Sequence, residues 1–320
     1  MNPVLPAAAG PDGRLPGSDL SEPAPERSVY PRSKGSDTTV PASKLARSAG
    51  RPVRLGRGVS LSALGALLSI AAARQLRGRK LAILCTLFAL PVLFAILAQR
   101  FQAPYRADDV EAVLIFGLIP QALLPLSALL FASGIVQDDV EEQTLTYLLI
   151  RPIPRWLIYV AKVAGTWLVT FLLTSLFTTA ALATVYWGTG IFEPLALFQR
   201  AAILSGILSL SSLAYIAIFG GLGLLWRKSL ILGVSYIIIF EGVLANIDFL
   251  VRHATVMYYL RTLSVRLLHL NADDWAIDPA TAPGVATCLL TLAGIGLVLT
   301  LTSAWLFSVR EFRVKTPEGS

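Results

Sequence analysis

The chain has 320 residues, of which 55% are hydrophobic and 15% are charged, and its formal net charge is +7. Because soluble proteins carry about a quarter charged residues, this composition excludes an ordinary soluble domain. The apolar residues form runs of about 18 or more, the length that crosses a bilayer as a helix. Lys and Arg gather beside these runs, where they favour anionic lipid headgroups as partners and not nucleic acid. We therefore predict an all-α polytopic protein of the lipid bilayer.

Two segments precede the first long apolar run. Residues 1–58 are rich in Pro, Ser, Gly and Arg and poor in large apolar side chains, so we predict a disordered cytoplasmic arm. Within residues 59–80, an apolar run of about fifteen residues is too short to span easily, and basic residues follow it. We predict an interfacial amphipathic helix on the inner leaflet. The alternative is a seventh, marginal span.

Six transmembrane helices are predicted within residues 81–310, which leaves 311–320 as a cytoplasmic tail. Lys and Arg are much more frequent on one side of these helices, and the positive-inside rule then makes both termini cytoplasmic. In the long outer loop, 248–283, apolar residues recur at helical spacing from Val256 to Leu268. We expect this helix to pack on the outer membrane surface. The predicted spans are 81–98, 113–136, 163–187, 201–226, 229–247 and 284–307.

The inner segment 137–162, between the second and third predicted spans, has an unusual composition for a connecting loop. Asp139 is followed three residues later by Glu142, which fits a capping box at the start of a helix. The residue before Pro152 is biased away from the α region, so the helix should end there. Pro154 can occupy the first position of a new helix. We predict a short amphipathic helix, a break, and a membrane helix; Leu145, Leu148 and Leu149 form the apolar stripe of the short helix.

This segment resembles the region between the second and third membrane helices of the ABC transporter type-2 permease family. Gln143 stands where that family usually has Gly, and the resemblance covers residues 75 to 310. It implies that the chain is an ABC transporter permease of the cell membrane, expected to be the bacterial plasma membrane. Such a permease works with a second permease copy or a related permease, and members of the family usually export their substrate. The residues that carry the resemblance are Asp139, Glu141, Thr144, Leu145, Leu148, Leu149, Pro152, Arg155 and Lys162.

The resemblance also implies that ATP is bound by a separate ABC ATPase subunit. The nearest stretch to a phosphate-binding loop, Gly223–Ser229, has Lys-Ser but lacks the preceding Gly. We therefore expect no cofactor and no catalytic residue in this chain. The surface implied for coupling to the ATPase consists of Asp138, Asp139, Glu141, Glu142, Thr144, Leu145, Leu148, Leu149, Arg151, Pro152 and Arg155.

Glu241 is the only charged residue well inside a predicted span. A charge at mid-bilayer costs about 2.5–3.5 kcal/mol, so such a side chain usually faces the protein interior or a cavity. Glu241 is a proton or substrate contact in the pathway, or else it has a structural place: a protonated carboxyl bonded to a neighbouring helix, or a residue near enough the outer surface to meet water. We favour the structural interpretation. The rival function is an intramembrane enzyme or channel that uses Glu241 and outer-loop side chains. Those side chains, whose spacing matches no metal site, are Asp248, His253, His269, Asp273, Asp274 and Asp278.

Overall fold

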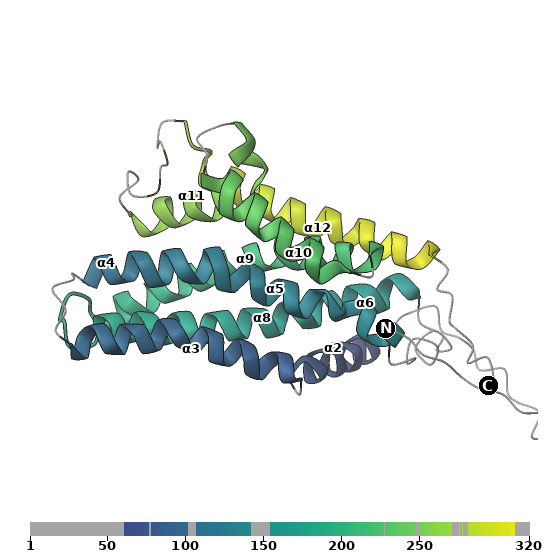
Figure 1. Cartoon of the computed structure of the whole chain (residues 1–320), viewed down its shortest axis with the longest axis horizontal. Coiled ribbons are helices and arrows are strands. Elements are labelled where there is room, and N and C mark those ends of the chain that lie inside the picture. The colour runs from purple at the N-terminus through teal and green to yellow at the C-terminus, as the bar shows by residue number, and fades with distance from the viewer. Residues whose placement is uncertain are drawn as a thin grey trace, which may run out of the picture. The chain divides into compact units, whose positions relative to one another are not determined.

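In the computed structural model, every regular element of the described residues is a helix (Figure 1). The helices belong to one compact unit, Gly56–Ser320. The predicted arm 1–58, the second half of the predicted coupling helix and the tail 311–320 lie outside the described residues. The structure describes residues 61–76, 78–101, 107–141, 154–226, 228–246, 250–270, 275, 277 and 281–310.

Five helical segments are long and apolar enough to cross a membrane. Each is longer than its predicted span, because the helices continue beyond the apolar run at one or both ends. The second segment, Asp109–Asp138, is composite: it joins α4 (Ala107–Glu111), the π-helix η1 (Ala112–Leu123), α5 (Leu124–Ala132) and α6 (Gly134–Glu141). The other four are α3 (Arg79–Arg100), α8 (Arg155–Tyr186), α9 (Pro194–Leu225) and α12 (Val285–Val309).

The predicted fifth span, 229–247, is a shorter apolar helix, Ser229–Val243. It consists of α10 (Ser229–Tyr236) and a second π-helix, η2 (Ile237–Val243), and the 3-10 turn η3 (Leu244–Asn246) follows. Its length falls below the roughly 17 residues of the shortest spanning helices. Among the described residues, five helical segments are therefore long enough by themselves to cross a membrane.

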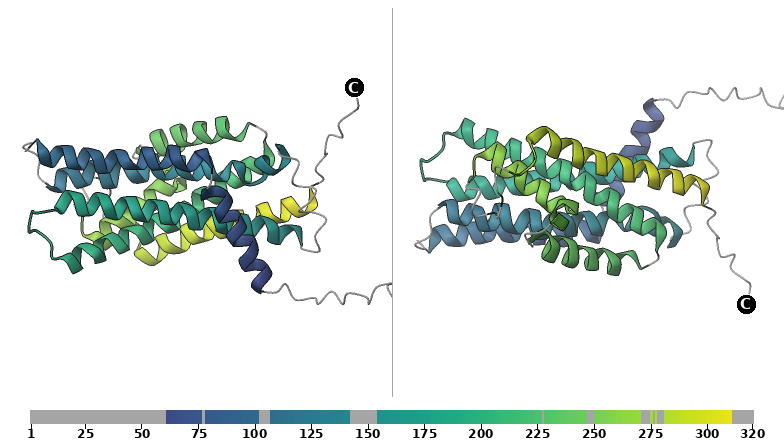
Figure 2. Two further views of the ribbon diagram at one scale, coloured as in Figure 1. Left: turned by 90° about the horizontal axis from the view of Figure 1, so that it is seen from below. Right: turned by 90° about the horizontal axis from the view of Figure 1, so that it is seen from above.

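The bundle is centred on α8 and α9, which lie side by side along their length. α12 packs against both of them, α3 packs against α8, and α5 packs against α9. α2 (Leu61–Leu76) crosses the beginning of α8 obliquely (Figure 2). The crossing is close because Gly165 has no side chain: a Cβ there would lie 2.8 Å from the Cβ of Ala71.

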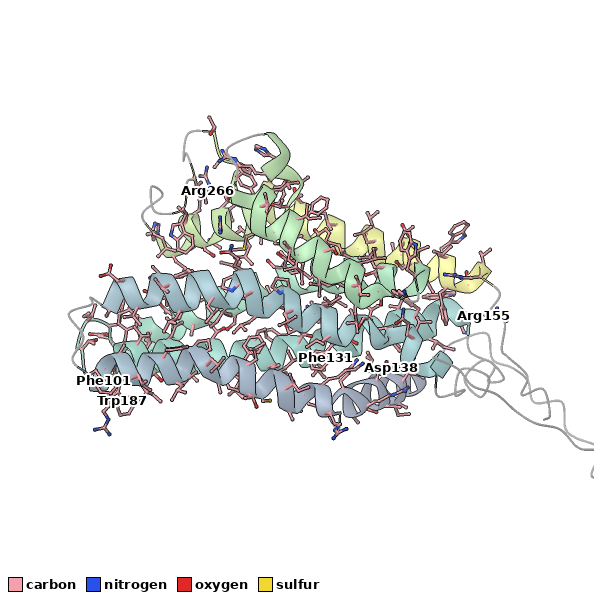
Figure 3. All side chains as sticks on the ribbon, in the orientation of Figure 1. Phe101, Phe131, Asp138, Arg155, Trp187 and Arg266 are labelled. Carbon is pink, nitrogen blue, oxygen red and sulfur yellow. The ribbon has the colours of Figure 1, made fainter. Side chains whose placement is uncertain are left out.

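Exposed aromatic side chains mark the two ends of the bundle. Phe101 and Trp187 lie at the end opposite Asp138 and Arg155 (Figure 3). At the Asp138 end, exposed tryptophans occur where helices start or stop, including Trp156 in the first turn of α8 and Trp226 just after α9. Leu and Ile side chains are exposed on the helices between these ends. This is the pattern of a membrane protein with aromatic belts at its two interfaces.

The predicted helix of the outer loop is confirmed with the same bounds, as α11 (Val256–Leu268). Its predicted location on the outer membrane surface is wrong, because α11 packs against α9, α12 and η1 within the protein. Met257, Leu260 and Leu263 are completely buried there. The apolar face of α11 explains this packing, because neighbouring helices of the protein shield it from water just as lipid would. α11 lies toward the end of the bundle that carries α4 (Figure 1).

Candidate functional site

The predicted coupling surface is partly described, and α6 is its first element. α6 begins at Gly134, directly after the turn at Ser133, and continues through Asp138, Asp139 and Glu141. The predicted helix start at Asp139 is therefore wrong, because the backbone is already helical one turn earlier. Of the rest of the surface, Arg155 is described. The residues that lie outside the described ones are Glu142, Thr144, Leu145, Leu148, Leu149, Arg151 and Pro152.

Asp138 of α6 forms an ion pair with Lys80, the second residue of α3, with 2.9 Å between Nζ and Oδ2. Both side chains are about two-fifths exposed, so the pair contributes at most about 1 kcal/mol. Its role is geometric, since it connects the start of the first long helix to α6. Gly134 makes room for the pair: a Cβ there would lie 2.6 Å from the Lys80 Nζ.

Gln137 of α6 binds the end of α9. Its Nε2 donates to the carbonyl oxygen of Trp226 at 2.7 Å and to that of Gly223 at 3.2 Å. The last carbonyls of a helix have no partner within the helix, and Gln137 therefore acts as a cap from another element. Arg310, at the end of α12, donates to the Leu224 carbonyl of the same turn. The carboxyl-terminal end of α9 is thus held by both α6 and α12.

Lys162, in the second turn of α8, donates from Nζ to the carbonyl oxygen of Ile135 at 2.8 Å. This carbonyl lies in the first turn of α6, so α8 is also connected to α6. α8 begins at Arg155, after Pro154 in the N-cap position, which agrees with the new helix predicted at Pro154. The helix extends two turns before the predicted span 163–187. Lys162 and Arg155 are helical residues and not loop residues.

Arg155 is the first residue of α8, and it is exposed. A cation at the amino terminus of a helix is unfavourable, because the helix dipole is positive there. Arg155 consequently does not serve the stability of α8. It lies at the same end of the bundle as Asp138 (Figure 3), where its guanidinium is available to an acidic or phosphate-bearing surface.

Glu241 is fully buried in η2. Its Oε2 accepts a hydrogen bond of 3.1 Å from the backbone N–H of Met257, in the first turn of α11, and the Tyr236 hydroxyl donates to Oε1 at 3.5 Å. The first N–H groups of a helix have no intrahelical acceptor, and a carboxylate there also complements the helix dipole. In this structure the contacts of Glu241 are those of a cap for α11.

A second buried carboxylate was missed by the sequence analysis. Glu111, 3% exposed, accepts from Arg200 Nε at 2.8 Å and from Arg200 Nη2 at 3.1 Å. The Tyr186 hydroxyl donates to the same carboxylate, and Arg200 Nη1 donates to the carbonyl of Leu268 at 3.4 Å. This network joins α4, α8, α9 and α11. Arg200 stands over the ring of Phe192, 5.5 Å from its centroid.

The histidines invoked by the rival function do not share a site. His253 precedes α11 and packs on Tyr258, with ring centroids 4.6 Å apart, whereas His269 follows α11 in a left-handed conformation. A helix of this length separates them by about 20 Å. Asp248, Asp273, Asp274 and Asp278 lie outside the described residues. Glu241 contacts neither histidine in the hydrogen bonds described above.

Comparison with known proteins agrees with this architecture. The model of the family described as ABC-2 family transporter protein matches residues 75–243, which is more than half of the chain. The match contains α6 with its partners Lys80, Lys162 and Trp226, and it extends to Glu241. No curated protein matches the chain. The apolar helices and the family match together make the chain a multi-pass membrane protein, and it belongs to the ABC-2 family of transporter proteins.

Proposed function

We propose that this chain forms the substrate pathway of an ABC exporter and receives, at α6, the motion of a separate ATPase subunit. Two copies of the chain, or one copy with a related permease, enclose the pathway in the plasma membrane of a bacterium. The ATP is bound by the partner, and the segment 137–162 is the surface that the partner contacts. The family match supports the permease role and, in general terms, an ABC ATPase as partner.

The observation that carries the proposal is the attachment of α6 to three long helices. Asp138 pairs with α3, Gln137 caps α9, and the Ile135 carbonyl accepts from Lys162 of α8. A displacement of α6 by the partner therefore acts directly on the inner ends of these helices. Binding of nucleotide shifts such a permease between two arrangements when the ATPase dimer fits one of them better.

The proposal includes six membrane crossings with both termini on the cytoplasmic side. α9 ends at the α6 side, whereas α11 lies toward the opposite end, so Ser229–Val243 runs from the inner to the outer side as a short crossing (Figure 1). α2 lies on the inner part of α8 as an interfacial helix. Lys80, Lys162 and Arg310 all contact groups at the α6 end, which is the positive side expected in the cytoplasm.

Arg155→Glu tests the coupling surface. The reversal should strongly reduce co-purification of the ATPase, because it places a repulsive charge at the rim of the contact and alters its salt dependence. Insertion should be unchanged, since Lys162 and the other inner charges preserve orientation. Arg100→Glu, at the exposed outer end of α3, is the matched control. Undiminished ATPase association of Arg155→Glu at equal expression would refute this surface and leave Arg155 as a lipid-headgroup contact.

A further inference from the structure

A groove between α8 and α9 lies within the parts of these helices that are apolar enough to cross a membrane. Its volume is about 590 Å³, which is within the range of about 300–1,000 Å³ for ligand pockets. The wall on α8 is aromatic, since the rings of Trp167 and Phe171 stack with their centroids 6.2 Å apart. The floor on α9 consists mainly of small residues, and an added Cβ at Gly206 would meet no atom within 4 Å. The groove therefore results from small residues of α9 that lie beside large ones of α8.

Polar groups on the two sides of the groove bind to each other. The Ser175 hydroxyl donates to the Ser205 hydroxyl at 3.1 Å, and Trp167 Nε1 donates to the Ser209 carbonyl oxygen at 2.9 Å. A polar group without a partner is costly inside the hydrocarbon region of a bilayer, and these pairs avoid that cost. The groove thus presents mainly carbon to an occupant, and these groups require no hydrogen bond from it.

The groove has the length of one leaflet of a bilayer. Along α9 its lining extends from Phe198 to Leu213, about 22 Å at 1.5 Å per residue. It begins near the end of the bundle where exposed Trp187 lies (Figure 3). It ends at Leu213 because α12 packs there: an added Cβ at Gly296 would lie 2.9 Å from Leu213 Cγ. Half of a bilayer with its headgroups is about 20–22 Å thick, so the groove matches one leaflet.

The length, the closed end and the surroundings of the groove favour a lipid chain over a helix of another protein. A helix that crosses the membrane needs about 20 residues, or about 30 Å, and it would collide with α12 at Leu213. A lipid chain ends near the middle of the bilayer, where the groove ends. Leu172 and Leu176, each next to a lining residue of α8, are 55% and 65% exposed. The groove is therefore continuous with a surface that lipid covers.

We propose that the groove between α8 and α9 binds one acyl chain of a bilayer phospholipid, in the leaflet at the Trp187 end of the bundle. The chain packs on the rings of Trp167 and Phe171 and supplies the dispersion contacts that the small residues of α9 leave unmade. It is then a resident part of the packing between the two central helices. This site is separate from the coupling surface, and the proposal does not rest on the proposed function.

Photocrosslinking with a modified lipid tests the site. The purified full-length protein is reconstituted in vesicles of phosphatidylethanolamine and phosphatidylglycerol, and a small fraction of the phosphatidylethanolamine carries a diazirine in the middle of one acyl chain. After irradiation, mass spectrometry counts the adducts on residues 198–213 and on Leu297 and Leu301, which are exposed on α12. A chain held in the groove should give several-fold more adducts on the groove residues, because chains exchange freely along an open helix face.

Two glycine substitutions separate the groove from the general lipid surface. Gly206→Phe places a ring in the groove and should reduce the adducts on the other groove residues to the level on α12. Gly294→Phe, in α12, is the matched control and should leave the groove adducts unchanged. Both variants should fold, since an added Cβ at either glycine would meet no atom within 4 Å. Their melting temperatures in detergent check this.

Three results would overturn the proposal. The first is an equal adduct yield on the groove and on α12 in the parent protein, or groove adducts that persist in Gly206→Phe. The second is a disulfide-linked dimer of Gly206→Cys in a Cys85→Ser, Cys288→Ala background, which would make the groove an interface between two copies. The third is loss of the groove adducts during ATP hydrolysis by a co-purified ATPase, which would identify the chain as transported cargo and not as a resident lipid.

Discussion

The side-chain amide of Gln137 lies 2.7 Å from the carbonyl oxygen of Trp226, so that one residue of α6 caps the carboxyl-terminal end of α9. The two residues are 89 positions apart in the chain. The carbonyl belongs to a helix end, where some donor must be supplied from outside the helix. Gln137 makes that donor part of the element that we propose to receive the motion of the ATPase.

Replacing Gln137 by Leu should uncouple α9 from α6. The substitution removes one donor at a net cost of about 0.5–1.5 kcal/mol, so the protein should still fold and bind its ATPase. A cysteine at Leu225, which is exposed at the end of α9, should change its maleimide reactivity with ATP in the parent and not in Gln137→Leu. Gln199→Leu, exposed near the amino-terminal end of α9, is the control. An undiminished response in Gln137→Leu would show that α9 moves independently of this contact.

Breaking the ion pair between Glu111 and Arg200 should destabilise the protein strongly, whereas replacing both residues by apolar ones should destabilise it much less. Glu111→Gln leaves the Arg200 guanidinium buried without its carboxylate, and we expect the free energy of unfolding to fall by about 3–5 kcal/mol. The double variant Glu111→Leu, Arg200→Leu should recover most of that loss, because no uncompensated charge remains. Thermal unfolding in detergent measures both. Glu193→Gln should stay within about 0.5 kcal/mol of the parent; a double variant less stable than Glu111→Gln would contradict the argument.

Gly165→Val should displace α2 from α8. The added Cβ would lie 2.8 Å from the Ala71 Cβ and 3.3 Å from the Ala72 backbone nitrogen, and overpacking of this kind typically costs about 1–3 kcal/mol. The melting temperature in detergent should fall accordingly. Gly206→Val is a matched control within α9, where a Cβ would meet no atom within 4 Å. Equal melting temperatures of the two variants would show that the α2–α8 contact contributes nothing to stability.

Removal of residues 1–58 should leave insertion intact. This segment has few large apolar residues to bury, so its loss costs no packing in the bundle. The family match also begins later, at residue 75. The measurement is the amount of truncated protein in the membrane fraction at matched synthesis. Loss of the truncated protein from that fraction would give the arm a role in targeting or folding.

Local pattern predicted the elements whose apolar spacing is regular. α11 was predicted with its exact bounds, because the apolar face from Val256 to Leu268 follows the helical period. The location of α11 was predicted incorrectly, since an apolar face gives no information on whether lipid or protein covers it. The helices are longer than the predicted spans because their ends, such as the part of α8 with Arg155 and Lys162, carry charges that a hydropathy pattern excludes from a span. The start of α8 was predicted by Pro154 instead.

The candidate site depended on contacts between distant segments, and these were only partly predictable. Lys162 was one of the residues that carried the family resemblance, and the coupling surface implied by it started at Asp138. Nothing local pointed to Lys80, Gln137 or Trp226 as partners. Glu111 was missed because it stands two residues before the expected start of the second span. Its partner Arg200, 89 positions away, stands directly before the predicted fourth span, 201–226. The sequence signal that could have predicted this ion pair is a carboxylate at the edge of one span and an Arg at the edge of another.

The uninterrupted length of α9 determines how far a small movement at one end of the helix is transmitted. The helix runs for 32 residues, and its only proline is at the first position, where it does not interrupt the helix. At 1.5 Å per residue it is a rod of about 48 Å. Its carboxyl-terminal end is attached to Gln137 and Arg310, and Arg200 near its amino-terminal end is attached to Glu111 and Leu268. A tilt of about 3–5° imposed at the first pair shifts Arg200, about 37 Å away along the helix, by about 2–3 Å, which is enough to separate hydrogen-bonded atoms.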